Sequence, residues 1–427
     1  MKALKKTTRV NLIISVGLFI LTLVLQLLFV LNPHGAVMTP DGALYSNIAT
    51  HLLHGEGFVQ DVRSYAIVVP PLYPVFLAFV YAIFGIENLT AVLVIQALLG
   101  ALTTVLIYKM AKELFNHWAG LFAGLLFSIY AVAIYHVGFI LTETLFTFLV
   151  ALLTYSLTHL LRPQATYWTA GLAGLVWGLT CLTRPHFLFF IPFLWLMLVI
   201  LLKRRGIKMA GISTLLLLIT IAPWIGYSYI EYGCFMPIAS HGGITLWCGN
   251  GPFVNPDRYY RSTLYAGDPL FTAQLKEGMS LPLCEQEQFF RNTALQFIVS
   301  HPLKFVDNIW RKFVLFRTLV NLHIKLFRVS TLDSLITATD KWLLILFLPG
   351  LLVSVFPKWS FKQSQVLLWL ILYYSLGVSV GIVVSQGRYR LPIMPLVAVY
   401  GGLAIWGLVY GLVKGIGKIR DMVKREK

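Results

Sequence analysis

Residues 11–30 read NLIISVGLFILTLVLQLLFV, a strongly apolar run without a charged residue that follows the basic start MKALKKTTRV. A helix needs about 20 such residues to cross the hydrocarbon core of a bilayer. The run is longer than the apolar core of a secretory signal peptide, which has about 7 to 15 residues, and no small-residue cleavage site follows it. We therefore interpret it as a retained transmembrane anchor whose N-terminus is cytoplasmic.

The composition indicates that this anchor is one of several. Of the 427 residues, 58% are hydrophobic and 12% are charged, and the mean hydropathy is +0.77. Soluble domains carry about 25% charged residues. The sequence therefore predicts an all-α polytopic membrane protein.

Apolar segments recur along the chain with basic residues at alternate ends. An even number of spans would return the basic C-terminal tail to the cytoplasm. The apolar stretch at 70–85, PPLYPVFLAFVYAIFG, is not counted as a span, because a span there would invert every later basic loop. We expect it to form a juxtamembrane helix on the outer face. The ten expected spans lie near residues 10–31, 89–108, 119–140, 144–161, 168–183, 186–202, 209–228, 342–357, 365–385 and 392–413.

The net charge of +17 follows this topology. With a cytoplasmic N-terminus, the cytoplasmic loops and tails hold 19 of the 34 Lys and Arg residues and only three acids. Basic residues concentrate on the cytoplasmic side of membrane proteins. The charge therefore reports orientation in the cell (inner) membrane, and no nucleic-acid partner is needed to explain it.

Two long external segments divide the spans into groups. We expect an N-terminal transmembrane catalytic module at 1–228 with an external loop at 31–88, an external segment at 229–341, and C-terminal spans with a basic tail at 342–427. Aromatic residues recur at helical spacing over 285–319 with Lys and Arg between them. This pattern predicts amphipathic helices on the outer membrane surface.

Three of the four cysteines, Cys234, Cys248 and Cys284, fall in the 229–341 segment. One disulfide among them is compatible with an external location, but the spacing does not determine the pairing. The sequence contains no Walker loop and no Rossmann fingerprint. This argues against an ATP-driven pump and against a soluble nucleotide-sugar-binding domain.

An acid opens the first external helix. Thr39 can cap the helix and Pro40 can be its first residue, which places Asp41 in the first turn. One role for Asp41 is to complement the helix dipole, worth about 0.3 to 1 kcal/mol. We favour a catalytic role, because the helix begins where an external lid over a membrane-level cavity would start.

A second acid, Glu143, lies in ILTETLF between two apolar spans, on the same outer side as Asp41. It could simply cap the next span together with Thr142. However, a carboxylate this close to hydrocarbon is costly without a partner, by up to about 2.5 to 3.5 kcal/mol at a span centre. We therefore expect the two carboxylates to converge on one polar site.

Three arginines fall at other outer turns: Arg184 in LTRPHF, and Arg388 and Arg390 in QGRYRLPIMP. The planar guanidinium can donate two hydrogen bonds to a phosphate and stays charged. Each arginine alone could instead extend toward lipid head groups. Three of them beside two carboxylates favour a site for a phosphate and an acceptor.

The residues His51, His54 and Glu56 offer a weak metal pattern, with the two histidines three positions apart. No third strong ligand is fixed by the spacing, so we interpret them as residues on the solvated face of the helix. No cofactor is required by the sequence, and dependence on a divalent metal stays open.

Six segments resemble, in order, the bacterial members of the protein O-mannosyltransferase and aminoarabinose transferase superfamily, which are GT-C glycosyltransferases of the family 39 type. They are PDGALYSNIATHLLHGEGF at 40–58, PPLYPVFLAFVYAIFG at 70–85, ILTETLFTFL at 140–149, GLTCLTRPHF at 178–187, APWIGYSYIEYGCFMPIASHGGITLWCGN at 222–250 and GRYRLPIMP at 387–395. Each motif is short, but their order and spacing together are specific.

The resemblance implies transfer of a sugar from a polyisoprenyl-phosphate carrier to a lipid, glycan or protein acceptor outside the cytoplasm. It implies that Asp41 is the catalytic carboxylate and that Glu143 is the second family acid. As a mechanism, we expect Asp41 to act as the base of an inverting displacement. The neighbour of Asp41 is Gly42, where mannosyltransferases of the superfamily often have a second acid.

Many relatives carry Lys or Arg just before the Pro-Pro pair, where this chain has Val68 and Val69. The donor phosphate would then be held by Arg63, Arg184, Arg388 or Arg390. We expect Tyr45, Tyr73 and His54, which belong to the first external segment, to line the substrate cavity.

Two other classes of protein are weighed against a transferase. A transporter or flippase for a lipid-linked glycan also needs arginines on the outer face, but it predicts repeats and polar span centres, which the sequence lacks. A purely structural membrane subunit gives no reason for acids and arginines to gather on one side. The sequence identifies neither the sugar nor the acceptor.

Overall fold

Helices account for nearly all regular structure in the computed structural model, which describes residues 2–32, 37–60, 68–254, 268–318, 330–355, 361–381 and 387–425. Within these ranges the one β-type pairing is an isolated bridge between Val37 and Phe139. The predicted all-α class is therefore confirmed. The elements are α1 (Lys2–Val30), α2 (Pro40–Leu53), α3 (Leu72–Phe84), α4 (Leu89–Leu114), α5 (His117–Ser128), α6 (Ala131–Val137), α7 (Glu143–Leu160), α8 (Tyr167–Thr183), η1 (Pro185–Phe190), α9 (Ile191–Leu202), α10 (Arg204–Tyr232), α11 (Gly242–Asn250), α12 (Pro269–Met279), α13 (Leu283–Ser300), α14 (Pro302–Thr318), α15 (Ser330–Ser354), α16 (Phe361–Gly381), η4 (Gly387–Ile393) and α17 (Met394–Arg425).

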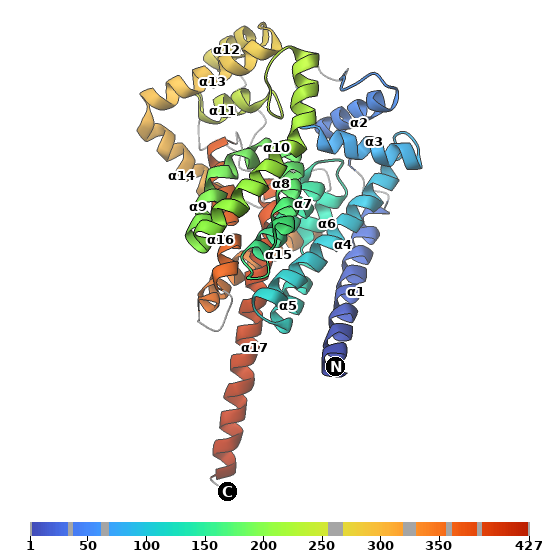
Figure 1. Cartoon of the computed structure of the whole chain (residues 1–427), viewed down its shortest axis with the longest axis vertical. Helices are drawn as coiled ribbons and strands as arrows, with labels where there is room; N and C mark the ends of the chain where they lie inside the picture. Colours follow the sequence, from blue (N-terminus) through green and yellow to red (C-terminus); the bar gives the residue numbers. More distant parts are fainter. Residues whose placement is uncertain are drawn as a thin grey trace.

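Eight of the described helices are long and apolar enough to cross a membrane, and α5 with α6, bent by 52° at their junction, can form a ninth. The remaining expected span corresponds to α8, which has 17 residues. The stretch that we did not count as a span forms the short apolar helix α3. Both chain termini lie at one end of the molecule, with α2, α3 and α11–α13 at the other end (Figure 1), as an even number of spans predicts.

Close helix crossings hold the bundle together. On α15, a side chain at Gly350 would meet the carbonyl oxygen of Tyr400 on α17 at 1.9 Å. On α8, a side chain at Gly174 would meet the Ser213 carbonyl on α10 at 2.2 Å. Small residues at such crossings let helix backbones approach closely in membranes. The contact at Gly350 holds α17, which follows the short η4 helix directly, against α15.

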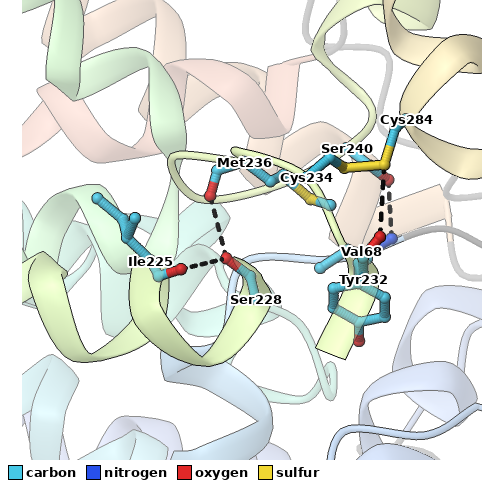
Figure 2. Close-up of a disulfide and its surroundings, with 8 residues drawn as sticks. All are labelled: Val68, Ile225, Ser228, Tyr232, Cys234, Met236, Ser240 and Cys284. Atoms are coloured by element: carbon cyan, nitrogen blue, oxygen red, sulfur yellow. Dashed lines mark hydrogen bonds between the residues drawn. A yellow bond between two sulfur atoms is a disulfide. The ribbon is translucent and has the colours of Figure 1, made fainter. Parts of the chain in front are cut away.

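We call the helices α11–α14 the external module, because we expect them to lie outside the membrane. In this module α11, α12 and α13 pack around the buried ring of Trp247, which stacks on Phe271 and packs on Phe290. A disulfide between Cys234, just after α10, and Cys284 in α13 ties this module to the bundle, as Figure 2 shows. This resolves the pairing that the spacing left open.

The first external segment is tied to the same region. Ser240 and Val68 exchange two hydrogen bonds, of 2.9 and 3.0 Å (Figure 2). The Tyr227 hydroxyl of α10 accepts a hydrogen bond from the Phe58 amide at 2.9 Å.

The C-terminal boundary that we expected at residue 341 falls inside α15, which begins at Ser330. The division into three parts stays a prediction.

Candidate functional site

The N-terminus of α2 is built as the sequence predicts. The Thr39 side chain accepts a hydrogen bond from the Gly42 amide at 3.0 Å, Pro40 is the first helical residue, and Asp41 is partly exposed in the first turn. This turn lies against the segment between α6 and α7, because the Val37 amide donates to the Gly138 carbonyl at 2.9 Å. The first external segment thereby brings Asp41 to the start of α7.

Gly42 is required by this contact. A side-chain carbon at position 42 would lie 2.7 Å from the carbonyl oxygen of Ile140 and 3.1 Å from the Met38 sulfur. Contacts below 3.0 Å essentially never occur, and a backbone carbonyl cannot rotate away as a side chain can. The absence of a second acid beside Asp41 therefore has a steric reason.

Glu143 begins α7 and is only 2% exposed. Its Oε1 accepts a hydrogen bond from Nη2 of Arg184 at 2.9 Å, and the same nitrogen donates to the Thr142 hydroxyl at 3.1 Å. Thr142 makes no side-chain capping bond to α7. The acid is thus the partner of an arginine rather than one half of a cap.

Arg184 owes its position to the residue that follows it. Pro185 disfavours helical backbone at the preceding residue, and Arg184 is extended, with φ of −146° and ψ of 114°. This ends α8, and the arginine side chain packs 5.1 Å from the Phe146 ring of α7. The LTRPHF motif therefore forms a turn that places the Arg184 guanidinium next to Glu143.

Arg388 arrives from the other end of the chain, in η4. Its Nε lies 3.9 Å from Oε1 of Glu143, and its Nη2 donates to the Tyr389 hydroxyl at 3.0 Å. The Tyr389 ring lies 4.9 Å from the Arg388 guanidinium and 5.5 Å from that of Arg184. One tyrosine ring thus contacts both guanidinium groups, which share a single buried carboxylate.

Two polar atoms of this cluster have no hydrogen-bond partner within the described ranges, although they are buried: Oε2 of Glu143 and Nε of Arg388. The same holds for Nε2 of His186, whose ring lies 5.7 Å from that of Phe146. Buried polar groups normally have a partner. An acceptor, a donor and an imidazole nitrogen that can serve as either suit a polar ligand.

Tyr45 lies one helical turn after Asp41 in α2, and four charged groups of the site influence the pKa of its phenol. Burial raises the pKa of Tyr45, and the carboxylates of Asp41 and Glu143 raise it further, against the opposing effect of the two arginines. The phenol therefore stays neutral at physiological pH and can donate a hydrogen bond.

Tyr73 lies beneath Tyr45, with ring centroids 5.2 Å apart, and is completely buried. Its hydroxyl donates to Oε1 of Gln96 at 2.9 Å, and Nε2 of Gln96 donates to the carbonyls of Val137 and Phe139 at 2.9 Å each. Tyr73 therefore supports the segment that precedes Glu143, whereas we expected it to line a cavity.

The structure does not bring His54 or Arg390 to this cluster. His54 is exposed at the far end of α2, beyond the contact of His51 with Glu56. Arg390 is buried against Asp340 of α15. Arg63 lies outside the described residues. Within those residues no three His, Cys, Asp or Glu side chains are grouped as a metal site requires.

Sequence reasoning missed three residues that shape the site: Tyr389, Gln96 and His186. Tyr389 stands between two arginines in GRYRLP, and His186 follows Arg184 by two positions. Both could have been proposed from this proximity. Gln96 carries no local signal, since it is a single amide in the long apolar helix α4.

The buried part of this cluster carries a surplus of positive charge. Arg184 and Arg388 bring two charges against one from Glu143, and Asp41 stands at the more exposed side. Guanidinium groups bind phosphate oxygens through charge-assisted hydrogen bonds. The cluster is therefore suited to an anion that carries a phosphate, next to a carboxylate that can take up a proton.

Residues 68–227 match the family described as dolichyl-phosphate-mannose-protein mannosyltransferase. Glu143 and Arg184 lie inside this range, whereas Asp41 and Arg388 lie outside it. Comparison with curated proteins gives no significant match.

Among solved structures, the apo form of the Archaeoglobus fulgidus oligosaccharyltransferase gives a TM-score of 0.59 at 14% identity, over 97% of this chain and 52% of that chain. The complex of AglB from this organism with an inhibitory peptide and a dolichol-phosphate gives 0.57 at 14% identity, over 96% and 52%. ArnT from Cupriavidus metallidurans bound to undecaprenyl phosphate gives 0.44 at 15% identity, over 91% and 77%, a score too low to support an argument.

The chain thus spans about half the length of the archaeal enzyme and shares its GT-C fold. The family match over residues 68–227 and this fold support the resemblance to GT-C proteins of the family 39 type.

Proposed function

We propose that this polytopic membrane protein with a GT-C fold is a glycosyltransferase that uses a sugar linked to a polyprenyl phosphate. The observation that carries the proposal is the cluster of Arg184, Arg388 and Glu143, with Asp41 held beside it by α2. Two guanidinium groups with one buried counter-charge form an anion site, and a carboxylate at its open side supplies a base. Neither a structural subunit nor a simple anchor needs this combination.

In the proposed reaction, Asp41 takes the proton of an acceptor hydroxyl or amine as that atom attacks the anomeric carbon of the sugar. The bond from this carbon to the phosphate oxygen breaks, and its electron pair stays on the polyprenyl phosphate. Arg388 and Arg184 stabilise the charge that develops there. General base catalysis of this kind contributes on the order of 10² to 10⁴ in rate. A single displacement inverts the anomeric carbon.

Glu143 and Tyr45 take supporting roles in this scheme. Through Oε1, Glu143 holds Arg184, and its Oε2 is available to accept a hydrogen bond from a hydroxyl of the sugar or the acceptor. The neutral phenol of Tyr45 can donate a hydrogen bond close to Asp41. The geometry favours Arg388 and Arg184 over Arg390 as the groups that hold the phosphate.

We assign the active site to the outer face of the cell (inner) membrane. The Cys234–Cys284 disulfide supports this assignment, because disulfides persist in oxidising compartments. The excess of basic residues on the opposite loops supports it as well. A lipid-linked donor suits this side, since its tail stays in the bilayer and its sugar phosphate lies at the interface.

The test measures release of polyprenyl phosphate from a panel of polyprenyl-phosphate sugars in native membrane vesicles that contain the acceptor. Wild type, Asp41→Asn and Glu277→Gln are compared, the last being an exposed acid of α12 as a matched control. We expect Asp41→Asn to lose at least about 10²-fold in turnover and to keep its binding of the lipid phosphate, and Glu277→Gln to behave as wild type. Wild-type turnover in Asp41→Asn would refute the assignment of the base, and no release from any donor would favour a lipid-glycan carrier.

A further inference from the structure

A buried carboxylate outside the site, that of Asp340, contacts both η4 and the bend between α5 and α6. Asp340 lies in α15, and its side chain is 2% exposed. It forms an ion pair with Arg390 of η4, and it accepts a hydrogen bond at 2.8 Å from the hydroxyl of Tyr130. Ionisable residues at membrane depth are costly and are usually functional, with a specific partner.

The two partners of Asp340 belong to the two chain segments that carry Arg388 and Glu143. Arg390 follows Arg388 and Tyr389 directly in η4. Tyr130 stands at the bend between α5 and α6, and α6 continues into the segment that carries Glu143. On the preceding residue of α15, the Thr339 hydroxyl accepts a hydrogen bond from the Ala131 amide at 3.3 Å, so the same bend is held twice.

The guanidinium of Arg390 also reaches the external module. Its Nη1 donates to the carbonyl of Phe316 in α14 at 2.6 Å. Arg390 thereby joins η4 to both α15 and α14, and it is only 2% exposed. With these partners Arg390 fixes the backbone of η4, and Arg388, two residues earlier, faces Glu143.

We propose that Asp340 is a positioning residue, which holds Arg390 and Tyr130 so that Arg388 and Glu143 stay at the separation required to bind the donor phosphate. This inference rests on the proposed function, because it assigns the effect of Asp340 to binding of a lipid phosphate. Asp340 itself contacts none of the residues that we place at the reacting atoms.

The test compares Asp340→Asn with Asp307→Asn in the purified full chain. Asp307 is the matched control, because it pairs with Arg311 on the exposed surface of α14. The first measurement is amide hydrogen exchange over residues 387–393 and 139–144. The second is the KM for the donor together with kcat, and the Kd for polyprenyl phosphate.

For Asp340→Asn we expect faster exchange in both segments, and a KM and a Kd raised on the order of ten- to a hundredfold, with a smaller change in kcat. Asp307→Asn should match wild type in all of these. A purely structural role would lower the yield of folded protein but leave KM and Kd of the folded fraction unchanged, and that result would overturn the proposal.

A second variant covers the case in which Asp340→Asn does not fold. Asp340→Leu combined with Arg390→Met replaces the buried pair by apolar groups, a change that other proteins often tolerate. We expect this double variant to fold and to show the same raised KM and rapid exchange, and wild-type values in it would contradict the proposal. If wild type releases no lipid phosphate from any donor, the proposed function fails, and the exchange measurement alone decides whether Asp340 holds η4.

Discussion

The contact of α2 with the segment before Glu143 gives a sharp prediction for Gly42→Ala. The added carbon would start 2.7 Å from the Ile140 carbonyl oxygen, and ordinary contact begins near 3.4 Å. Because that oxygen belongs to the backbone, α2 itself must move by most of the difference. Overpacking of this kind costs about 1 to 3 kcal/mol, and displacement of a catalytic group by about 1 Å can cost on the order of 10²-fold in rate.

We therefore expect Gly42→Ala to lower kcat/KM for release of polyprenyl phosphate by at least about tenfold, because Asp41 is the neighbouring residue and moves with the helix. The measurement uses purified protein with the donor found active in wild type. Unfolding temperature, measured in parallel, should fall only modestly.

The matched control is Gly226→Ala in α10, where an added carbon meets nothing within 4 Å. Alanine is favoured over glycine inside a helix by about 0.8 to 1 kcal/mol, so this variant should be at least as stable as wild type and equally active. Gly42→Ala with kcat/KM within twofold of wild type would show that the contact does not position Asp41.

Two further predictions concern the external module. Replacing Cys234 and Cys284 by alanine should lower the free energy of unfolding by up to about 4 kcal/mol in the chain-entropy account, since the cysteines are 50 residues apart. Thermal unfolding with and without reductant measures this effect, with Cys248→Ser as the control. An unchanged unfolding transition would contradict the prediction. Burial lowers the pKa of Lys312 in α14 to about 7, whereas the unfolded chain binds this proton up to about pH 10.4. The free energy of unfolding should therefore rise from pH 7 toward pH 10, and fall as the pH drops back to 7. Thermal unfolding across this range measures it. If stability rises equally with pH in Lys312→Met, Lys312 is not the cause of the effect.

Much of the architecture follows from local patterns in the sequence. Apolar length and the side of the basic residues are sufficient to find the spans and to keep 70–85 apart from them. The cap formed by Thr39 and Pro40 is also local, because the Thr39 hydroxyl needs only an amide three residues away. The start of α2, and with it the place of Asp41, could therefore be predicted.

The different partners of Arg388 and Arg390 could not be predicted from local patterns in the sequence. Arg388 and Arg390 are two residues apart in one motif, yet the first faces Glu143 and the second faces Asp340. Which partner each one meets depends on the packing of α15 and α7 against η4, and no local pattern records that packing. The exposed position of His54 has the same cause, since the direction of α2 is set by its contact with residues 138–140.

The order in which the cluster residues occur has a consequence for biogenesis. Asp41 and Glu143 are synthesised early, Arg184 follows, and Arg388 belongs to the last part of the chain to be made. A nascent chain therefore holds Glu143 beside a single arginine through most of its insertion. The second arginine can join only after η4, which follows α15 and α16 in the chain, has been made. The complete cluster can therefore form only after the last part of the chain has been made and inserted.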